Sequence, residues 1–285
     1  MKLEFAKMHG LGNDMIVINS LSSGFAPTEG QARFLCDRRL GVGADQVLVL
    51  LPSATADYRM RIFNRDGSEV EMCGNGIRCL ALYLHERGLS DKDPLAIETL
   101  AGVIRPERRG DLIRVDMGAP IFAAERIPIV TPVARIHALS AGESKVRDEV
   151  IEVDDDKFRM SAVSMGNPHC VIKVERVDEV PLEVLGPKLE HHPWFPQRTN
   201  VEFVQVEDRG RLKVRVWERG AGATLACGTG ACAAGVAMMD LGLVLREVVV
   251  VLPGGELAIA WDAVTNRVFM TGPAAFVFDG DIELP

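Results

Sequence analysis

The sequence predicts an α+β fold of two pseudo-symmetric lobes, each with a curved sheet wrapped around one central helix. Three observations predict it. A motif occurs twice, other residues repeat at the same spacing, and each half contains many strand-like runs around one long helix-like run. The motif is MCGNGIRCLA at residues 72–81 and ACGTGACAAG at residues 226–235, and its leading cysteines, Cys73 and Cys227, are 154 positions apart.

The same spacing recurs along almost the whole chain. One match could arise by chance, but several in register on turn-forming and polar residues imply two copies of one unit. The matched pairs are Gly12 with Gly166, Asn13 with Asn167, Gln46 with Asn200, Asn64 with Glu218, Gly88 with Gly242, and Gly118 with Gly272.

The first copy alternates strands with two helices. Thr28 is placed to cap a helix from Glu29 to about Arg39, and the spacing of Ile77, Leu80 and Leu84 predicts the central helix. The central helix is expected from Asn75 to about Arg87, and strands at 3–8, 15–19, 46–51, 58–63, 95–99, 102–106 and 112–117.

The second copy repeats this order. Helices are expected at 182–191 and from Gly228 to about Leu241, with strands at 160–163, 169–174, 201–206, 212–217, 246–252, 256–260 and 267–271. The tail FVFDGDIEL also resembles a strand. The charged insertion at 140–157 is expected to be a connecting surface segment.

Size and composition bound the class of protein. A chain of 285 residues suggests about two domains. Its net charge of −8, without a basic stripe, argues against nucleic-acid binding, and no apolar run reaches the length of a membrane helix. Six cysteines without a secretory signal favour a cytoplasmic protein with reduced thiols.

The paired motif suggests acid–base chemistry by two thiols. A helix N-terminus lowers the pKa of a thiol, and the adjacent glycines free backbone N–H groups for a ligand carboxylate. If Cys73 and Cys227 face each other across a cleft between the lobes, each sulfur can reach one face of a single carbon. One thiolate would remove the proton next to a carboxylate, and the other thiol would deliver a proton to the opposite face.

The other cysteines have simpler interpretations. Cys36, Cys79, Cys170 and Cys232 are expected in the core. A zinc site is disfavoured, because cysteines five or six positions apart at a helix start suit a tetrahedral site poorly. A redox pair would remain possible, but the Cys,x,x,Cys spacing is absent.

The repeated amides favour a polar ligand held from both lobes. Each of these amide residues, taken alone, would be interpreted as a turn or cap residue. The repeat is broken at His169, which lies opposite Met15, and at Glu218, which lies opposite Asn64. Such asymmetry would allow one half to act as base and the other as acid, although a core histidine is the alternative for His169.

At these residues the sequence resembles the diaminopimelate epimerase family. The resemblance runs through FAKMHGLGNDMIVIN, DRRLGVGADQ, RIFNRDGSEVEMCGNGIRC, SMGNPHCV, RTNVEF and WERGAGATLACGTGACA. It implies interconversion of LL- and meso-diaminopimelate without pyridoxal phosphate, metal or other cofactor, in lysine and peptidoglycan precursor synthesis. It also implies a homodimer and β-barrel-like lobes at residues 1–118 and 119–272, with the tail 273–285 returning to the first lobe.

The resemblance also implies roles for single residues. Cys73 and Cys227 would be the acid–base pair, Cys73 as donor and Cys227 as acceptor in one direction, and His169 and Glu218 would tune their pKa values. The substrate would be bound as follows: the α-carboxylate by the amides of Gly74, Asn75, Gly228 and Thr229, the α-ammonium by Asn64, Glu218 and the Arg219 carbonyl, and the distal end by Asn13, Gln46, Asn167, Asn200 and the Arg219 guanidinium.

Three departures from the family pattern touch none of these contacts. Met15 replaces a common aromatic residue, Ala223 a more polar one, and Phe278 a tyrosine of the dimer contact. Two other functions stay open. One is a related two-cysteine racemase of histidine or proline, against which Arg219 and the four amides argue, and the other is a non-catalytic carboxylate-binding protein.

Overall fold

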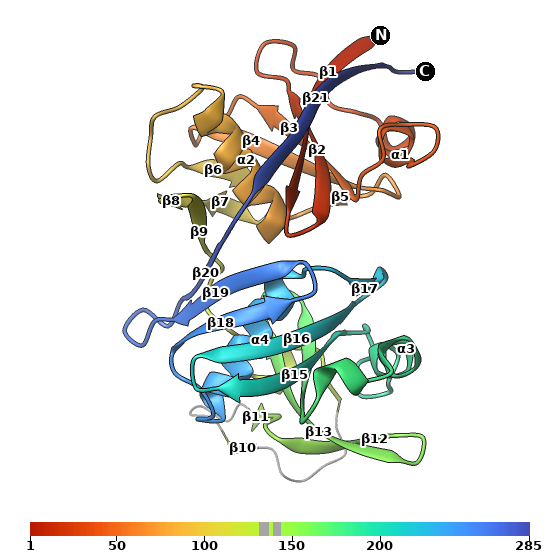
Figure 1. The fold of residues 1–285 in the computed structure, drawn as a ribbon, viewed down its shortest axis with the longest axis vertical. Helices are drawn as coiled ribbons and strands as arrows, with labels where there is room; N and C mark the ends of the chain where they lie inside the picture. Colours follow the sequence, from red (N-terminus) through yellow and green to blue (C-terminus); the bar gives the residue numbers. More distant parts are fainter. Residues whose placement is uncertain (131–136, 139–143) are drawn as a thin grey trace. The chain divides into compact units, whose positions relative to one another are not determined.

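The chain forms two compact units, each containing a sheet and a central helix (Figure 1). The computed structural model describes residues 1–130, 137–138 and 144–285. The first unit comprises Met1–Asp116 and Thr271–Pro285, and the second comprises Met117–Met270. The predicted α+β fold class is confirmed.

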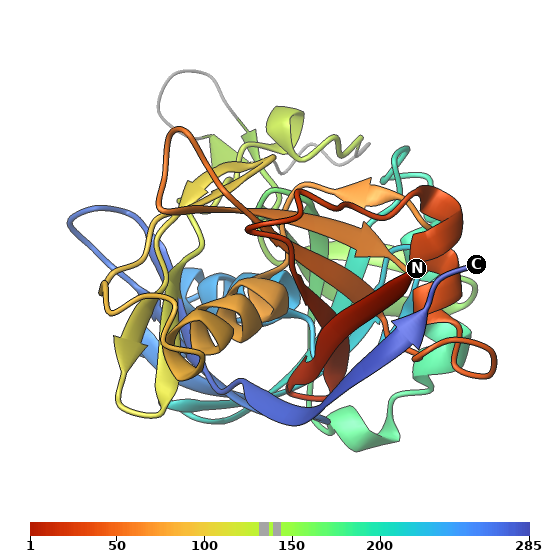
Figure 2. The same cartoon turned by 90° about the horizontal axis from the view of Figure 1, so that it is seen from above.

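In the first unit, the sheet order is β21-β1-β2-β3-β4-β6-β7, with β5 beside β4. The central helix α2 packs on β1, β2, β3 and β9, and the curve of the strands around it is visible in Figure 2. The elements are β1 (Lys2–Gly10), β2 (Asn13–Asn19), α1 (Glu29–Cys36), β3 (Gln46–Leu51), β4 (Tyr58–Asn64), β5 (Glu69–Val70), α2 (Gly74–Glu86), β6 (Ile97–Thr99), β7 (Gly102–Ile104), β8 (Glu107–Arg109), β9 (Leu112–Asp116) and β21 (Ala275–Glu283).

In the second unit, the sheet order is β12-β13-β14-β15-β16-β18-β19-β20, with β17 beside β16. The elements are η1 (Ala124–Arg126), β10 (His137–Ala138), β11 (Ser144–Lys145), β12 (Glu149–Val153), β13 (Asp156–Ser164), β14 (Pro168–Val174), η2 (Val177–Glu179), α3 (Leu182–Glu190), β15 (Asn200–Asp208), β16 (Arg211–Glu218), β17 (Gly222–Thr224), α4 (Gly228–Asp240), β18 (Glu247–Leu252), β19 (Gly255–Trp261) and β20 (Val268–Gly272).

The two units repeat one connectivity. In each, an antiparallel hairpin leads through a short helix to a parallel strand, and a second antiparallel pair leads through the central helix. The register is also repeated, because Met15 pairs with Gln46 in the first unit and His169 with Asn200 in the second. The first hairpin turns through Gly12 and Gly166, whose φ angles of 84° and 97° favour glycine. The predicted duplication is therefore confirmed.

The central helix of the second unit is buried on nearly every side. Its sequence, GTGACAAGVAMMD, contains small and apolar residues all round, as expected of a helix inside a domain. It packs on β13, β14, β15, β16, β18 and β19. Gly235 allows close approach to the sheet, because a Cβ there would lie 3.1 Å from Ile259 Cγ2. This packing holds α4 against the inner face of its sheet.

Two predictions of local structure were wrong. The first short helix ends at Cys36 rather than Arg39, because Asp37 is extended and its carboxylate accepts from the backbone of Arg39 and Leu40. The segment 144–157 is not a connecting surface segment, because it contains β11 and β12, with Ile151 fully buried. Buried and exposed residues alternate along β12, so the segment forms a strand on the core although many of its residues are charged. Residues 140–143 of that prediction lie outside the described part of the chain.

No helix within the described ranges is both long enough and apolar enough to cross a bilayer.

Candidate active site

Both motif cysteines occupy the residue that caps a central helix. Cys73 precedes α2 and Cys227 precedes α4, each with extended backbone angles. Each sulfur accepts from the backbone N–H three residues later, Gly76 N at 3.4 Å and Gly230 N at 3.4 Å. An N-cap position otherwise favours Ser, Thr, Asp or Asn. The repeat therefore places one thiol at the N-terminus of each central helix.

The residue three positions after each cysteine is a glycine, and a larger side chain there would contact its neighbours too closely. A Cβ on Gly76 would lie 3.1 Å from Leu48, and one on Gly230 would lie 2.9 Å from Glu202 Oε1 and 3.3 Å from Cys227 Sγ. The first turn of each helix therefore lies directly on the side chain of a neighbouring strand.

The first half-site is a network of amides around Cys73. Asn13 Oδ1 accepts from Asn75 Nδ2 at 3.1 Å and lies 4.0 Å from Cys73 Sγ. Asn13 Nδ2 donates to Asp45 Oδ2 at 3.0 Å. Asp45 therefore fixes the amide so that its carbonyl faces the start of α2.

Gln46 and Asn64 form the second part of this half-site. They lie on paired strands, and Gln46 Nε2 donates to Asn64 Oδ1 at 2.9 Å. Asn64 Nδ2 in turn donates to Ser68 Oγ at 3.2 Å. Gln46 Oε1 is buried and has no hydrogen-bond partner among the described residues. Because buried polar atoms are rarely unpaired, this oxygen is a candidate acceptor for a ligand.

The second half-site contains a chain of hydrogen bonds that ends at Cys227. Asn167 Nδ2 donates to Thr229 Oγ1 at 3.4 Å, and Thr229 Oγ1 lies 3.5 Å from Cys227 Sγ. Asn167 Oδ1 lies 2.9 Å from His169 Nε2, and His169 Nδ1 lies 2.7 Å from Glu202 Oε1. His169 and Glu202 are both fully buried. His169 therefore belongs to a polar network and is not a lone core histidine.

Asn200, Glu218 and Arg219 lie at the adjoining strand ends. Asn200 Oδ1 accepts from Arg219 N at 2.9 Å, and Asn200 Nδ2 donates to the Pro168 carbonyl at 2.9 Å. Thr224 Oγ1 donates to Glu218 Oε1 at 2.5 Å. The Arg219 guanidinium donates to the Gln197 carbonyl at 3.2 Å. Asn200 thus bonds to the backbone on either side, whereas Glu218 and the Arg219 guanidinium have partners outside the chain of hydrogen bonds that ends at Cys227.

Burial reverses the expected acidity of one thiol. Burial and the charges of Glu218 and Glu202 raise the pKa of Cys227 well above its usual value. Hydrogen bonds from Thr229 and the Gly230 amide act in the opposite direction and are outweighed. The expectation that the helix start lowers the pKa is therefore wrong for Cys227, whose pKa is raised.

The remaining cysteines are core residues, as predicted. Cys36, Cys79, Cys170 and Cys232 are at most 4% exposed. Burial raises the pKa of Cys79 to about 12. Within the described ranges, no group of three or more His, Cys, Asp or Glu side chains is arranged to hold a metal ion.

Sequence reasoning missed three residues that organise the half-sites: Asp45, Arg78 and Glu202. Arg78 is fully buried and joins Asn75 Oδ1 at 3.0 Å to the Pro273 carbonyl at 3.1 Å. Asp45 lies in the loop before Gln46. Glu202 could have been found, because it is a charged residue opposite the apolar Leu48 at the repeat spacing.

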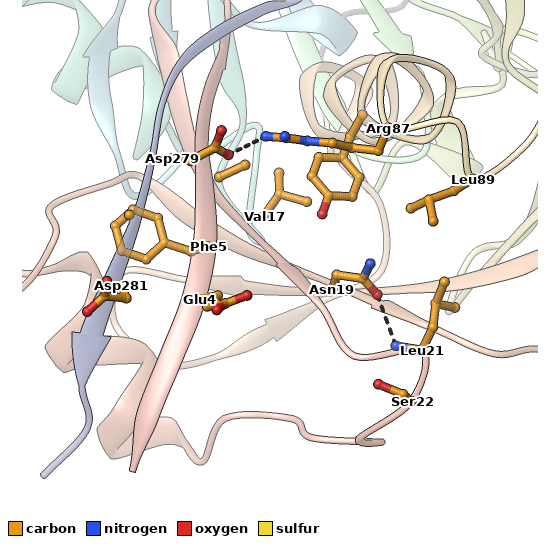
Figure 3. A pocket seen from close by; sticks show the side chains of 13 residues that line it. Glu4, Phe5, Val17, Asn19, Leu21, Ser22, Arg87, Leu89, Asp279 and Asp281 are labelled. Atoms are coloured by element: carbon orange, nitrogen blue, oxygen red, sulfur yellow. Dashed lines mark hydrogen bonds and ion pairs between the residues drawn. The ribbon is translucent and has the colours of Figure 1, made fainter.

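A separate cavity of about 810 Å³ lies at the other end of α2 (Figure 3). It is lined by Glu4, Asn19, Tyr83, Arg87 and Asp279, among others. Tyr83 and Arg87 belong to the last turn and C-cap of α2, whereas Cys73 precedes its first residue. This cavity therefore contains none of the predicted site residues.

The fold is shared with known amino-acid epimerases. It resembles the crystal structure of a hydroxyproline epimerase from Agrobacterium vitis with bound trans-4-hydroxy-L-proline, at a TM-score of 0.69 and 16% identity, covering 99% of this chain and 92% of that one. At this identity the likeness establishes the fold alone, a duplicated α+β fold.

The sequence then identifies the family. The diaminopimelate epimerase family model matches residues 5–123 and 161–277. Diaminopimelate epimerase of Moorella thermoacetica is 52% identical over 290 residues, covering 99% of this chain and 100% of that protein. Diaminopimelate epimerase 1 of Nostoc sp. is 53% identical over 287 residues, with the same coverage. The chain belongs to the diaminopimelate epimerase family, as its motifs predicted.

Proposed function

We propose that this protein is a diaminopimelate epimerase, which interconverts LL- and meso-2,6-diaminopimelate in the synthesis of lysine and peptidoglycan precursors. Family membership supports the substrate and the reaction. The observation that carries the chemistry is the repeated helix cap, where Cys73 and Cys227 occupy equivalent positions at the N-termini of α2 and α4. No other pair of cysteines in the described residues caps two helices.

The reaction needs only the two thiols and the substrate. The thiolate of one cysteine takes the proton from the α-carbon, and the thiol of the other gives its proton to the opposite face. The products are the substrate with its α-carbon inverted and a cysteine pair in which the thiol and the thiolate have changed places. No oxidant or cofactor is consumed. The raised pKa of Cys227 favours its protonated form, so that Cys227 would be the donor and Cys73 the acceptor when the resting pair first meets substrate, which is the reverse of the direction named above.

The polar residues divide between the two ends of the substrate. The amides of Gly74, Asn75, Gly228 and Thr229 would bind the α-carboxylate and stabilise charge that develops as the proton leaves. Asn64, Glu218 and the Arg219 carbonyl would hold the α-ammonium. The distal end would be held by Asn13, Gln46, Asn167, Asn200 and the Arg219 guanidinium, and the unpaired Gln46 Oε1 supports a donor on the ligand.

Exchange of the α-proton with solvent tests this function. The enzyme is incubated in heavy water with diaminopimelate, histidine and proline, and deuterium at the α-carbon is measured by mass spectrometry. We expect incorporation with diaminopimelate only. Absence of exchange with every amino acid would favour a carboxylate-binding protein, and exchange with histidine or proline alone would favour the related racemases.

We also propose that the protein is a cytoplasmic homodimer that pairs through β21. This strand is at the edge of its sheet and exposes Val277 and Phe278, which are 54% and 48% accessible. Phe278→Glu should lower the sedimentation coefficient from that of a dimer toward that of a monomer. Val264→Glu, at a 92% exposed apolar residue of the second unit, is the matched control. A wild-type monomer would contradict the proposal.

A further inference from the structure

The residues beneath the two catalytic helices differ between the repeats. In the first unit, Leu48 lies under Gly76, and in the second Glu202 lies under Gly230. Leu48 and Glu202 are equivalent in the repeat, and so are Met15 and His169. A buried apolar pair in one unit is therefore replaced by a buried acid–base pair in the other.

Burial of this carboxylate has a cost that an apolar residue would avoid. Glu202 is fully buried, and burial raises the pKa of its carboxyl against the opposing effect of His169. Glu202 Oε2 has no hydrogen-bond partner among the described residues. The carboxyl group therefore bonds to His169 through Oε1 alone. Leu48 shows that the fold accepts an apolar side chain at this place. A buried carboxylate with one unpaired oxygen, at a position where the other repeat has leucine, points to a role other than packing.

The hydrogen bonds around His169 fix the position of one proton. Glu202 and His169 share one proton through Nδ1, whichever of the two carries it. Nε2 lies 2.9 Å from Asn167 Oδ1, an oxygen that can only accept, so this contact assigns a hydrogen to Nε2, which donates it. With its oxygen so engaged, Asn167 directs Nδ2 toward Thr229 Oγ1. The Thr229 hydroxyl hydrogen is then left to point at Cys227 Sγ.

The equivalent amide of the first unit is fixed with the opposite polarity. Asn13 gives its Nδ2 to Asp45, which leaves its oxygen toward Asn75 and Cys73. Asn167 gives its oxygen to His169, which leaves its Nδ2 toward Thr229. The repeat thus presents an acceptor at one thiol and a donor at the other.

We propose that Glu202 is a positioning residue of the second half-site. It holds His169 as a donor from Nε2, and it thereby sets the amide of Asn167 and the hydroxyl of Thr229 toward Cys227. The kinetic part of this inference rests on the proposed epimerase function, whereas the position of the proton does not.

Two variants separate the hydrogen bond from packing. Glu202→Leu copies Leu48 and removes the partner of Nδ1. Glu202→Gln keeps a group whose N–H can donate to Nδ1, so that Nε2 retains its hydrogen. We expect Glu202→Leu to keep the wild-type melting temperature or exceed it and to lose at least tenfold in kcat/KM, mainly through KM. Glu202→Gln should restore kcat/KM to within about threefold of wild type.

The wild-type enzyme is also tested without substrate. In protein labelled with ¹⁵N-histidine, the His169 Nε2 signal should show a directly bonded hydrogen at neutral pH. His169→Met in combination with Glu202→Leu copies Met15 and Leu48, and loss of the signal in that variant assigns it. An unprotonated Nε2 in the wild type would overturn the inference, whether or not Glu202→Leu folds.

The kinetic outcomes are equally decisive. If Glu202→Leu kept kcat/KM within twofold of wild type, or if both single variants lost it equally, Glu202 would not act through this hydrogen bond. A wild-type enzyme without α-proton exchange would overturn the proposed epimerase function, whereas the NMR result would still decide the position of the proton.

Discussion

At the scale of single residues, the proposed chemistry depends on two thiols in unlike surroundings. Cys227 is 5% exposed, lies near two carboxylates and has a raised pKa. Cys73 is less buried and lies near the Asn13 carbonyl. The repeat supplies the same residue twice, and its neighbours make the two copies different.

Replacement of either sulfur tests the two-base reaction. Cys73→Ser and Cys227→Ser should each lower turnover by a factor of about 10³ or more, because a serine hydroxyl is far less acidic than a thiol. Racemisation of labelled diaminopimelate measures the rate, and circular dichroism checks the fold. Cys79→Ser, within α2 and outside the half-site, is the control that should retain turnover. Wild-type rates in either motif variant would contradict the reaction.

A second residue-scale prediction concerns Asp14 and acid stability. Burial acts to raise the pKa of Asp14, but hydrogen bonds from Arg38 and Lys7 outweigh it and hold the pKa well below its usual range. Lys7 Nζ and Asp14 Oδ2 are 2.6 Å apart and both side chains are largely buried. A depressed carboxyl pKa stabilises the fold above the unfolded pKa near 4 and loses that contribution as pH falls.

Asp14→Asn should therefore destabilise the protein by about 2 kcal/mol at pH 7, and by less at pH 3. Urea unfolding at the two pH values measures the difference. Asp66→Asn is the control and should have a smaller effect, because Asp66 lies in an exposed turn and accepts from the Ser68 backbone N–H. An equal loss at both pH values would show that Asp14 contributes through shape and not through charge.

At the scale of elements, packing decides what a helix accepts. Gly186 of α3 lies against the ring of Trp217, with which a Cβ would collide. Gly30 of α1 has open space, because the nearest atom to a Cβ is Thr28 Oγ1 at 4.0 Å. The same residue type in two short helices is thus required in one and replaceable in the other.

The same substitution should therefore have opposite effects. Gly186→Ala should lower the free energy of unfolding by about 2 kcal/mol through overpacking, and Gly30→Ala should raise it by up to about 1 kcal/mol through helix propensity. Denaturant unfolding with the two variants in parallel measures both. A gain in both would mean that α3 moves away from Trp217 without cost.

At the scale of the whole molecule, the chain ends meet in one sheet. β21 pairs antiparallel with β1 from Lys2 to His9, and Leu284 is buried. Arg87, the C-cap of α2, forms an ion pair with Asp279 of the returning strand. The last residues therefore belong to the unit that begins with the first ones.

Removal of residues 275–285 should therefore destabilise the first unit by more than about 5 kcal/mol, which is comparable with the stability of a domain. Loss of β21 uncovers β1 and opens a sheet edge that favours aggregation. Solubility and thermal unfolding measure the effect, with removal of Pro285 alone as the control. A soluble, cooperatively folded truncation would show that β21 is dispensable.

The sequence by itself determined the duplication and the order of the main elements, and it predicted the candidate residues of both half-sites apart from Asp45, Arg78 and Glu202. Turn glycines, helix caps and alternating apolar residues act over a few positions, so they leave a readable pattern. The family resemblance supplied the roles. Asn13 and Asn167 could thus be paired before any contact between side chains was known.

Only the tertiary structure decided how those residues behave. The pKa of Cys227 depends on burial and on Glu218 and Glu202, which are near in space and not adjacent in sequence. The hydrogen bonds of His169 likewise depend on a strand that returns after a helix. Burial and charge act across such distances, whereas sequence patterns report the local backbone. For that reason the sequence could predict where the chemistry lies, whereas the hydrogen-bond partners of each polar atom became known only from the fold.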